Sequence, residues 1–403
     1  MKFAHMADCH IGAWRDPKLK DLSIDAFVKA IRISIDHKVD FIIIAGDLFN
    51  TALPGIDNLK TAVKSLKELK EKNIAVYIIP GSHDFSPSGK TMIDVLEEAG
   101  LVINVVKGHV QEGKLHLHFT QDEKTGVKIT GMLGKRGILE KSYYEKLDHE
   151  SLEKEQGKKI FIFHGPIREL MGAENSPMEA YDLSYMPKGF EYYAGGHVHI
   201  IKEYSDSNYK KVVYPGPLFP ASFSELEKLG CGGFFIYDNG RIIREEINIK
   251  NVFTVKIDAE NKSPEEVEKT IYEKTAKKEF VNTIVLMRVS GKLKTGKTSD
   301  IHFKEITSDI YSQGAFFVMR NTNKLISEEF EEIKIDEKTV DDVEDSLIKE
   351  HLQQIKVSGF TSEKEYAVTK ELIHIFEQEK HEGEKVYEYD ERVRKDADKL
   401  LDV

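Results

Sequence analysis

The feature that most constrains the fold is an alternation, over the first 250 residues, of short apolar runs with amphipathic helical segments. The run "VDFIIIAGDLF" at 39–49 is apolar on both faces, which is typical of a parallel strand covered by helices. Residues 21–37 and 56–72 instead repeat their apolar side chains at helical spacing. This order predicts the α/β class, a layered β-sheet with helices on the outside.

Further strands are predicted from other apolar runs of the same half of the chain. Residues 232–249 contain Asp238-Asn239-Gly240, a turn sequence that predicts a hairpin, and we expect 212–219 to be antiparallel as well. The other predicted strands are "KFAHMA", "IAVYIIPG", "KIFIFHG" and "GFEYYAGGHVH".

Two more regions follow, giving three predicted domains at 1–251, 252–330 and 331–403. Residues 252–330 alternate three strand-like runs with a helix beginning at Ser263-Pro264 and another at 299–311, which predicts a small α/β domain. Residues 331–403 are highly charged and helical in pattern, with Gly359 between two amphipathic stretches. We expect this third region to form a C-terminal helical tail.

The composition of the chain limits the classes of protein to which it can belong. The chain has 403 residues, two cysteines and no run of eighteen apolar residues, so we expect a soluble cytoplasmic protein without a membrane span or secretory signal. Its net charge is −11, but residues 331–403 hold 22 acidic and 12 basic residues. The first 330 residues are therefore nearly neutral, and the acidic total does not exclude a nucleic-acid partner.

Asp and His side chains collect just after five of the predicted strands. The carboxyl ends of strands in an open α/β sheet line the crevice where ligands bind, and carboxylate with neutral imidazole suits Mn²⁺, Fe²⁺ or Zn²⁺. Any one cluster alone would be an ordinary turn or histidine. The five together predict a metal centre. They are Asp8-x-His10, Gly46-Asp47, Gly81-Ser82-His83-Asp84, His164-Gly165 and Gly195-Gly196-His197-Val198-His199.

This order of motifs resembles the calcineurin-like metallophosphoesterases. The segments "HMADCHIG", "AGDLFN" and "PGSHDF" are similar to the SbcD family of DNA double-strand-break repair nucleases, the meiotic-recombination-eleven family of archaea and eukaryotes. The resemblance implies a metallophosphoesterase (nuclease) domain at 1–251, an α/β capping domain at 252–330, and hydrolysis of phosphodiesters at DNA ends with two Mn²⁺ ions.

The resemblance also implies roles for individual residues. It places Asp47 between two metals, puts His83 against the scissile phosphate, and has Asp84 orient the His83 ring. The first metal would be held by Asp8, His10 and His199, and the second by Ser82, His164 and His197.

Ser82 departs from the family pattern, which usually has Asn at this position. The Ser hydroxyl is neutral and can hold a metal or a water, but its arm is one atom shorter. Three protein ligands with water suffice for a catalytic site, and His164, His197 and Asp47 remain. We expect weaker occupancy of the second metal and an active enzyme.

Partners follow from the same resemblance. They are DNA, a second copy of the chain through the 56–72 region, and an SbcC-type SMC-like ATPase through residues 338–403, in a nucleoid-associated setting. The apolar stripe of the 56–72 region comprises Ile56, Leu59, Val63, Leu66 and Leu69. The alternative to a dimer interface is that this stripe packs against the core of its own chain. The tail stretches carry Val340, Val343, Leu347 and Leu352, then Tyr366, Val368, Leu372, Ile375 and Phe376. A solvated charged helix pair is the alternative there.

Six basic residues in loops near the motifs are candidates for sequence-independent phosphate contacts, or alternatively are scattered surface charge: Arg15, Lys18, Lys90, Lys135, Arg136 and Arg168.

Three other functions stay open: a protein phosphatase or phosphomonoesterase, a small cyclic-nucleotide phosphodiesterase, and a DNA-end-binding scaffold without catalysis. Release of nucleotides from duplex DNA would separate a nuclease from the first two. Retention of DNA binding without metal binding would favour the scaffold.

Overall fold

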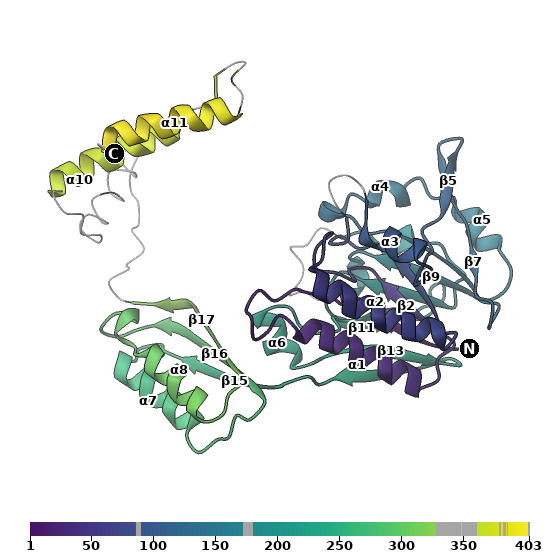
Figure 1. Cartoon of the computed structure of the whole chain (residues 1–403), viewed down its shortest axis with the longest axis horizontal. Coiled ribbons are helices and arrows are strands. Elements are labelled where there is room, and N and C mark those ends of the chain that lie inside the picture. The colour runs from purple at the N-terminus through teal and green to yellow at the C-terminus, as the bar shows by residue number, and fades with distance from the viewer. Residues whose placement is uncertain are drawn as a thin grey trace. The chain divides into compact units, whose positions relative to one another are not determined.

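The chain folds into two compact units, Met1–Glu328 and Glu329–Val403 (Figure 1). The computed structural model describes residues 1–85, 90–171, 180–327, 348, 361–378, 380–381, 384 and 386–401. None of the helices within these ranges is long and apolar enough to cross a lipid bilayer.

The first unit contains two six-stranded sheets. In the first sheet, β1 to β4 run parallel and β13 joins β1 antiparallel. The β13–β14 hairpin predicted from Asp238-Asn239-Gly240 is confirmed. In spatial order the strands are β14 (Arg241–Ile247), β13 (Gly232–Asp238), β1 (Lys2–Met6), β2 (Phe41–Ala45), β3 (Ala75–Ile79) and β4 (Ile103–Asn104).

The second sheet holds the later motif strands. β10 runs parallel to both β9 and β12. The antiparallel pairing expected at 212–219 is present, because β12 pairs antiparallel with β11 in this second sheet. In spatial order the strands are β11 (Ile201–Tyr204), β12 (Val212–Pro215), β10 (Tyr192–Gly196), β9 (Lys159–His164), β8 (Lys128–Met132) and β7 (Thr120–Gln121). A separate hairpin pairs β5 (Gly108–Gln111) with β6 (Lys114–Leu117).

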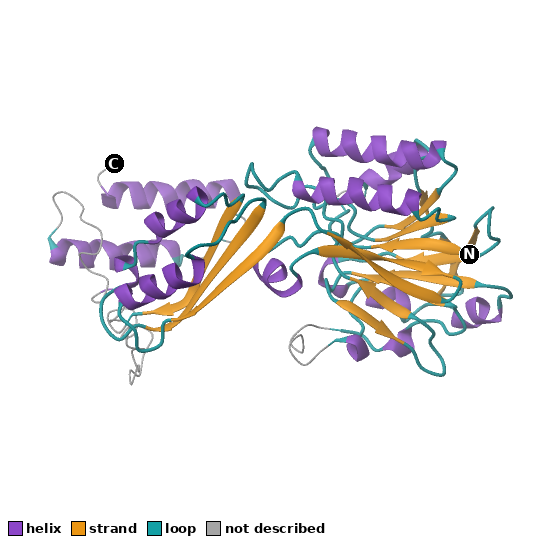
Figure 2. Cartoon of the chain, turned by 90° about the horizontal axis from the view of Figure 1, so that it is seen from below, coloured by secondary structure: helices purple, strands orange, loops and turns teal. Residues whose placement is uncertain are grey.

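Side chains from both sheets form a shared core. Phe3 and Phe41 of the first sheet lie fully buried with Tyr192 of the second. The long helices α1 (Leu22–Asp36) and α2 (Ile56–Glu71) pack side by side against the first sheet, as Figure 2 shows. This arrangement confirms the predicted fold class of layered sheets with helices outside. The shorter helices are α3 (Met92–Glu98), α4 (Lys141–Tyr144), α5 (His149–Lys154) and α6 (Phe223–Leu229).

The apolar stripe of α2 is mostly a core face. Leu66 and Leu69 are fully buried, and Leu59 and Val63 pack partly buried against the same core. Only Ile56, at the start of the helix, is largely exposed, at 82%. Four of the five stripe residues are therefore engaged within the chain, as the core-face alternative expected, and any dimer would have to use other side chains of this region.

Residues 251–326 form a three-stranded parallel sheet with two helices, in the predicted β-α-β-α-β order. The elements are β15 (Asn251–Asp258), α7 (Pro264–Thr275), β16 (Thr283–Lys292), α8 (Phe303–Ser312) and β17 (Phe317–Ile326). Ser263 caps α7 as expected, accepting from the backbone N–H of Glu266. The second helix begins at Phe303, later than Ser299, because Thr298–Asp300 forms a separate 3-10 turn.

The second unit contains α10 (Ser362–Phe376) and α11 (Val386–Leu401), which pack against each other. Helix α10 covers the second predicted amphipathic stretch, with Thr361 as its N-cap. Helix α11 lies in the tail that was predicted to be helical, although beyond the two amphipathic stretches singled out there. Val340, Val343, Leu347, Leu352 and Gly359 lie outside the described residues.

Candidate metal centre

The predicted clusters sit at one edge of the two sheets because their strands end there. Asp8, Asp47 and Ser82 follow β1, β2 and β3, while His164 ends β9 and His197 follows β10. Three overlapping groups among the described residues bring their ligand atoms within 4.8 Å of one another. These groups are Asp8 with His10 and His199, His10 with Asp47 and His83, and Asp8 with Asp47 and His164.

The backbone at this edge adopts conformations that L-residues rarely occupy. Positive φ angles occur at Asp8 (49°), His10 (40°), Asp47 (52°), His197 (97°) and His199 (48°). Such strain costs of order 1–3 kcal/mol per residue and clusters where function requires it.

Glycine beside the ligands allows the strand ends to approach closely. A Cβ on Gly81 would lie 2.3 Å from the backbone nitrogen of Asp47, well inside any tolerable contact. Gly81 is therefore required for the β2 and β3 loops to meet behind Asp47.

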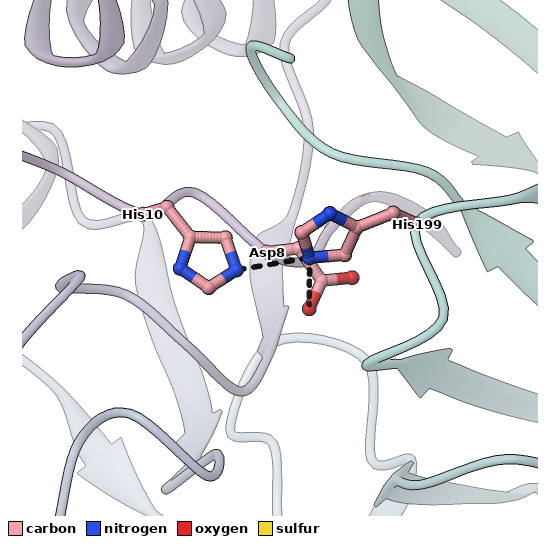
Figure 3. Close-up of side chains that lie close together, drawn as sticks. All are labelled: Asp8, His10 and His199. Carbon is pink, nitrogen blue, oxygen red and sulfur yellow. Dashed lines mark hydrogen bonds and ion pairs between the residues drawn. The ribbon is translucent and has the colours of Figure 1, made fainter. Parts of the chain in front are cut away.

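The group of Asp8, His10 and His199 faces one point in the crevice, as Figure 3 shows. The Nε2 atoms of His10 and His199 lie 2.9 Å apart, and His199 Nε2 lies 3.8 Å from Asp8 Oδ1. The backbone N–H of His197 donates to both Asp8 oxygens, at 2.9 and 3.0 Å. Two imidazole nitrogens this close, beside a buried carboxylate, form a donor set suited to a divalent cation.

Asp47 lies between this group and His164. Its Oδ2 atom is 3.2 Å from His164 Nε2 and 3.7 Å from His10 Nε2. Its Oδ1 atom accepts the backbone N–H of His83 at 2.7 Å, and the Ser82 hydroxyl donates to Oδ2 at 3.4 Å. One carboxylate oxygen therefore faces both halves of the crevice, as a bridging ligand must.

His164 and His197 line the other half. His164 Nδ1 pairs with the Ala45 carbonyl oxygen at 2.8 Å, which leaves Nε2 facing Asp47. The His197 ring packs edge-on against His164 with centroids 5.1 Å apart. Within the described residues His197 is in none of the three-ligand groups, so its nitrogens are placed less closely than the others.

Burial sets the charge states of these groups. It lowers the pKa of His10 and of His197 to about 3, so both rings are neutral at pH 7 and hold free lone pairs. Burial opposes ionisation of Asp47, yet the neighbouring His164 holds its pKa below the usual range. His164 is also desolvated, but Asp47 raises its pKa to about 10. Asp47 and His164 thus carry opposite charges, and a bound cation would lower the pKa of the His164 ring and release its proton.

His83 and Asp84 are arranged differently from the expectation. His83 Nδ1 pairs with the Asn50 carbonyl oxygen at 2.9 Å. Both Asp84 oxygens accept backbone N–H groups instead, from Gly81 at 2.9 Å and Phe49 at 3.2 Å. The Asn50 carbonyl therefore orients the His83 ring, and Asp84 fixes the two loops that carry Asp47 and His83.

The crevice opens into a cleft of about 410 Å³ that also contains residues the sequence analysis did not select. Ser224, Glu225 and Lys228 line it from α6, together with His83 and His199. Glu225 Oε1 lies 3.2 Å from His199 Nδ1. No strand-end pattern marks these residues, although Ser222-x-x-Glu225 is a recognisable helix-start sequence.

The six basic candidates are not part of the cleft lining. Lys18 lies over the Tyr311 ring, Lys135 donates to Tyr143, and Arg168 pairs with Asp182 at 2.9 Å. Arg15, Lys90 and Arg136 are exposed. Phosphate contacts by these residues stay a prediction.

The donor set fits divalent metals. His10 Nδ1 is a buried side-chain atom that lacks a hydrogen-bond partner, and an unpaired buried polar atom is costly unless something else binds it. His164 Nε2 faces the Asp47 carboxylate at 3.2 Å. The neutral imidazoles of His10 and His197 and the carboxylates of Asp8 and Asp47 supply donors that such an ion requires.

Comparisons with known proteins agree with this geometry. Residues 1–200 match the calcineurin-like phosphoesterase family. The DNA double-strand break repair protein Mre11 of Archaeoglobus fulgidus is 27% identical over 83% of this chain and 76% of its own length. The Mre11 protein of Methanococcus maripaludis is 29% identical over 68% of this chain and 73% of its own. That of Sulfolobus acidocaldarius is 31% identical over 49% and 50%.

The fold and site define a calcineurin-like phosphoesterase, a metal-dependent hydrolase of phosphoester bonds. Within that superfamily the chain is similar to the DNA double-strand break repair proteins named Mre11.

Proposed function

We propose that this chain is a two-metal nuclease that hydrolyses phosphodiester bonds at DNA ends in double-strand-break repair. The observation that carries the proposal is Asp47, whose Oδ2 atom lies within 3.7 Å of ring nitrogens in both halves of the crevice. The relatives are named for DNA double-strand break repair, which supports DNA as the substrate.

The ligands would divide around Asp47. Asp8, His10 and His199 would hold one metal, and His164 and His197 the other, with Ser82 directly or through water. Mn²⁺ is the proposed ion, because mixed carboxylate and imidazole donors suit it. Ser82 is 6% exposed and already donates to Asp47, so its hydroxyl is held beside the second half of the crevice.

Two divalent cations in such a site neutralise the phosphodiester charge and lower the pKa of an attacking water. The chain's own residues do the remaining work. The Asn50 carbonyl oxygen accepts from His83 Nδ1–H, so Nε2 is the ring nitrogen of this cleft residue that would carry the transferred proton. From there His83 would donate to the phosphate or to the leaving oxygen, which is general acid chemistry.

A nuclease assay tests the function directly. The full chain with Mn²⁺ is expected to release nucleotides from linear duplex DNA, and Asp47→Asn is expected to abolish the release. Hydrolysis of a phosphomonoester or cyclic nucleotide with none of DNA would favour a small-substrate hydrolase. DNA binding that persists without metal binding or cleavage would favour a scaffold.

An SMC-like ATPase of the SbcC type is the proposed partner of the tail. The segment 331–403 is strongly acidic, which disfavours DNA and favours a basic protein surface. On α10, Phe376 remains 59% exposed. A truncation ending at Asp336 is expected to keep Mn²⁺-dependent cleavage and lose ATPase binding. Full ATPase affinity in the truncated chain would exclude the tail as the docking element.

A homodimer through the 56–72 region and DNA contacts by a basic rim complete the proposal. Sedimentation at micromolar concentration is expected to show a dimer that Ile56→Asp dissociates, because Ile56 is exposed there. Binding to DNA is expected to weaken steeply with salt and to lack base preference. Salt-independent affinity would exclude a phosphate-contacting rim.

A further inference from the structure

We infer that Glu225 is the positioning residue of His199, and that α6 links this pair to the capping α/β domain at 252–330. The inference rests on the proposed role of His199 as a metal ligand. No strand-end motif contains Glu225, and it lies on a helix of seven residues, Phe223–Leu229.

The contact fixes which His199 nitrogen faces the crevice. Nδ1 lies 3.2 Å from Glu225 Oε1, and Nε2 lies 2.9 Å from His10 Nε2. With Nδ1–H donating to the carboxylate, Nε2 keeps its lone pair on the crevice side. A carboxylate partner on the far nitrogen also raises the basicity of a ligating imidazole and holds its ring orientation.

Hydrogen bonds hold both the carboxylate and the backbone of Glu225 in place. Its Oε2 atom accepts the backbone N–H of Ala221 at 2.9 Å. Its own backbone N–H donates to the Ser222 hydroxyl at 3.2 Å, the N-cap of α6. One carboxylate oxygen is thus anchored to the backbone, and the other is directed to the imidazole. His199 needs such support because its backbone has a positive φ of 48°.

The same helix is clamped to the capping domain. Glu227 accepts from Arg288 Nε at 2.9 Å and pairs with its second guanidinium nitrogen at 2.7 Å. The Arg288 guanidinium also lies 4.9 Å from the centroid of the Phe223 ring. Glu227 is only 13% exposed at its side chain, so this bidentate pair is partly shielded from water and geometrically specific.

Residues two apart on an α-helix point about 200° apart. Glu225 therefore faces His199 while Glu227 faces Arg288 on β16. A short helix fixed at one side by an Arg–carboxylate pair cannot tilt without moving its other side. The position of the capping domain is therefore coupled to the orientation of a proposed metal ligand.

Mn²⁺ titration of the full chain by calorimetry tests the first part. Glu225→Ala is expected to weaken one of two Mn²⁺ sites by about 10–100-fold, the range for removing such a supporting group. Glu225→Gln should lose less, because its amide oxygen still accepts the Nδ1–H. Glu98→Ala, at the exposed end of α3, is the matched control and should bind like the parent. Thermal midpoints in EDTA are expected to agree within error.

Parent-like Mn²⁺ affinity in Glu225→Ala would overturn the positioning role. So would a loss of affinity matched by a lower midpoint in EDTA and equal in Glu225→Gln, because that pattern reports unfolding alone. A parent protein that binds Mn²⁺ but cleaves no DNA would refute the nuclease proposal. The Mn²⁺ titration would then still test the positioning role of Glu225. A parent that binds no Mn²⁺ would overturn both.

Arg288→Met tests the link to the capping domain. Methionine keeps an unbranched side chain over Phe223 but removes the pair with Glu227. The variant is expected to weaken the same Mn²⁺ site severalfold, and to add little when combined with Glu225→Ala, because both changes act through one ligand. Unchanged Mn²⁺ affinity, or full additivity with Glu225→Ala, would overturn the link.

Discussion

Two sets of parallel strands within one compact unit present their strand ends very differently. At the edge of β1, β2 and β9, Asp8, Asp47 and His164 are at most 2% exposed. At the corresponding ends of β15 and β16 in the capping domain, Asp258 and Lys292 are exposed. Parallel strands create such an edge in both places. What distinguishes the metal centre is that its ionisable side chains are buried.

Backbone strain follows the same division. The non-glycine residues with positive φ near the capping sheet are Asn261, Lys277 and Asn282, which lie in turns between elements, where Asn tolerates this conformation. At the metal centre they fall on Asp and His side chains that converge. Buried charge and strain are both unfavourable in an empty protein, so their coincidence indicates that bound ions provide the compensation.

The largest effect is expected when an Asp is changed to Asn at each of the two sheet edges and the cleavage rates are compared. Asp47→Asn removes the carboxylate charge shared by the two halves and is expected to reduce Mn²⁺-dependent DNA cleavage by about 10⁴-fold or more, a large part of the acceleration a hydrolase supplies. Asp258→Asn, at the end of β15, is expected to cleave like the parent. Single-turnover cleavage at saturating Mn²⁺ measures both. Similar effects at the two edges would remove the distinction.

His83→Ala sharpens the division within the metal centre itself. His83 sits on the cleft and is oriented by the Asn50 carbonyl, so its loss is expected to cost about 10²–10³-fold in single-turnover rate as a general acid. Mn²⁺ affinity should be unchanged, because His83 is proposed to contact phosphate and not metal. A variant that loses Mn²⁺ binding together with rate would make His83 a ligand.

Ser82 is expected to give a smaller effect. Ser82→Asn should lower the Mn²⁺ concentration for half-maximal cleavage severalfold, because an amide oxygen reaches one atom further toward the second half of the crevice. Ser82→Ala is the complementary variant and should raise that concentration. If Ser82→Ala titrates like the parent, the hydroxyl is not a ligand, and water fills that position.

The metal-centre clusters could be predicted from sequence because each lies where an apolar run stops. That pattern is local, and parallel topology then brings the strand ends together. Glu225 gave no such signal, since its role depends on α6 folding back over the crevice. His83 lines the cleft, but its ring pairs with the Asn50 carbonyl oxygen and not with Asp84 as predicted. A backbone carbonyl partner leaves no trace in the side-chain pattern of the sequence.

The pairing of strands that lie far apart in the sequence could not be predicted in the same way. The run at 212–219 pairs antiparallel with β11, as expected, but on its other side it runs parallel to β10, and both partners lie in the second sheet. Sheet partners of a short apolar run depend on contacts that its own residues do not encode. The apolar stripe of α2 shows the same limit, because periodicity identifies a buried face but not what covers it.

The smallest expected effect concerns a buried ionisable group away from the sheet edge. His5 lies fully buried on β1 with Nδ1 paired to the Tyr192 hydroxyl at 3.0 Å. Burial lowers its pKa to about 3. Between about pH 6.5 and 3 the unfolded chain therefore binds a proton that the folded chain does not, so folding stability falls as pH falls.

His5→Gln removes this proton linkage while keeping a polar side chain near Tyr192. In EDTA, the parent is expected to lose roughly 2 kcal/mol more unfolding free energy than His5→Gln between pH 7 and pH 5. Denaturant titrations at the two pH values measure the difference, with the exposed His374→Gln as control. Equal losses in parent and His5→Gln would mean that the buried ring takes up a proton without cost. Burial of an ionisable group would then not by itself imply a compensating ligand, and the contrast between the two sheet edges would rest on backbone strain alone.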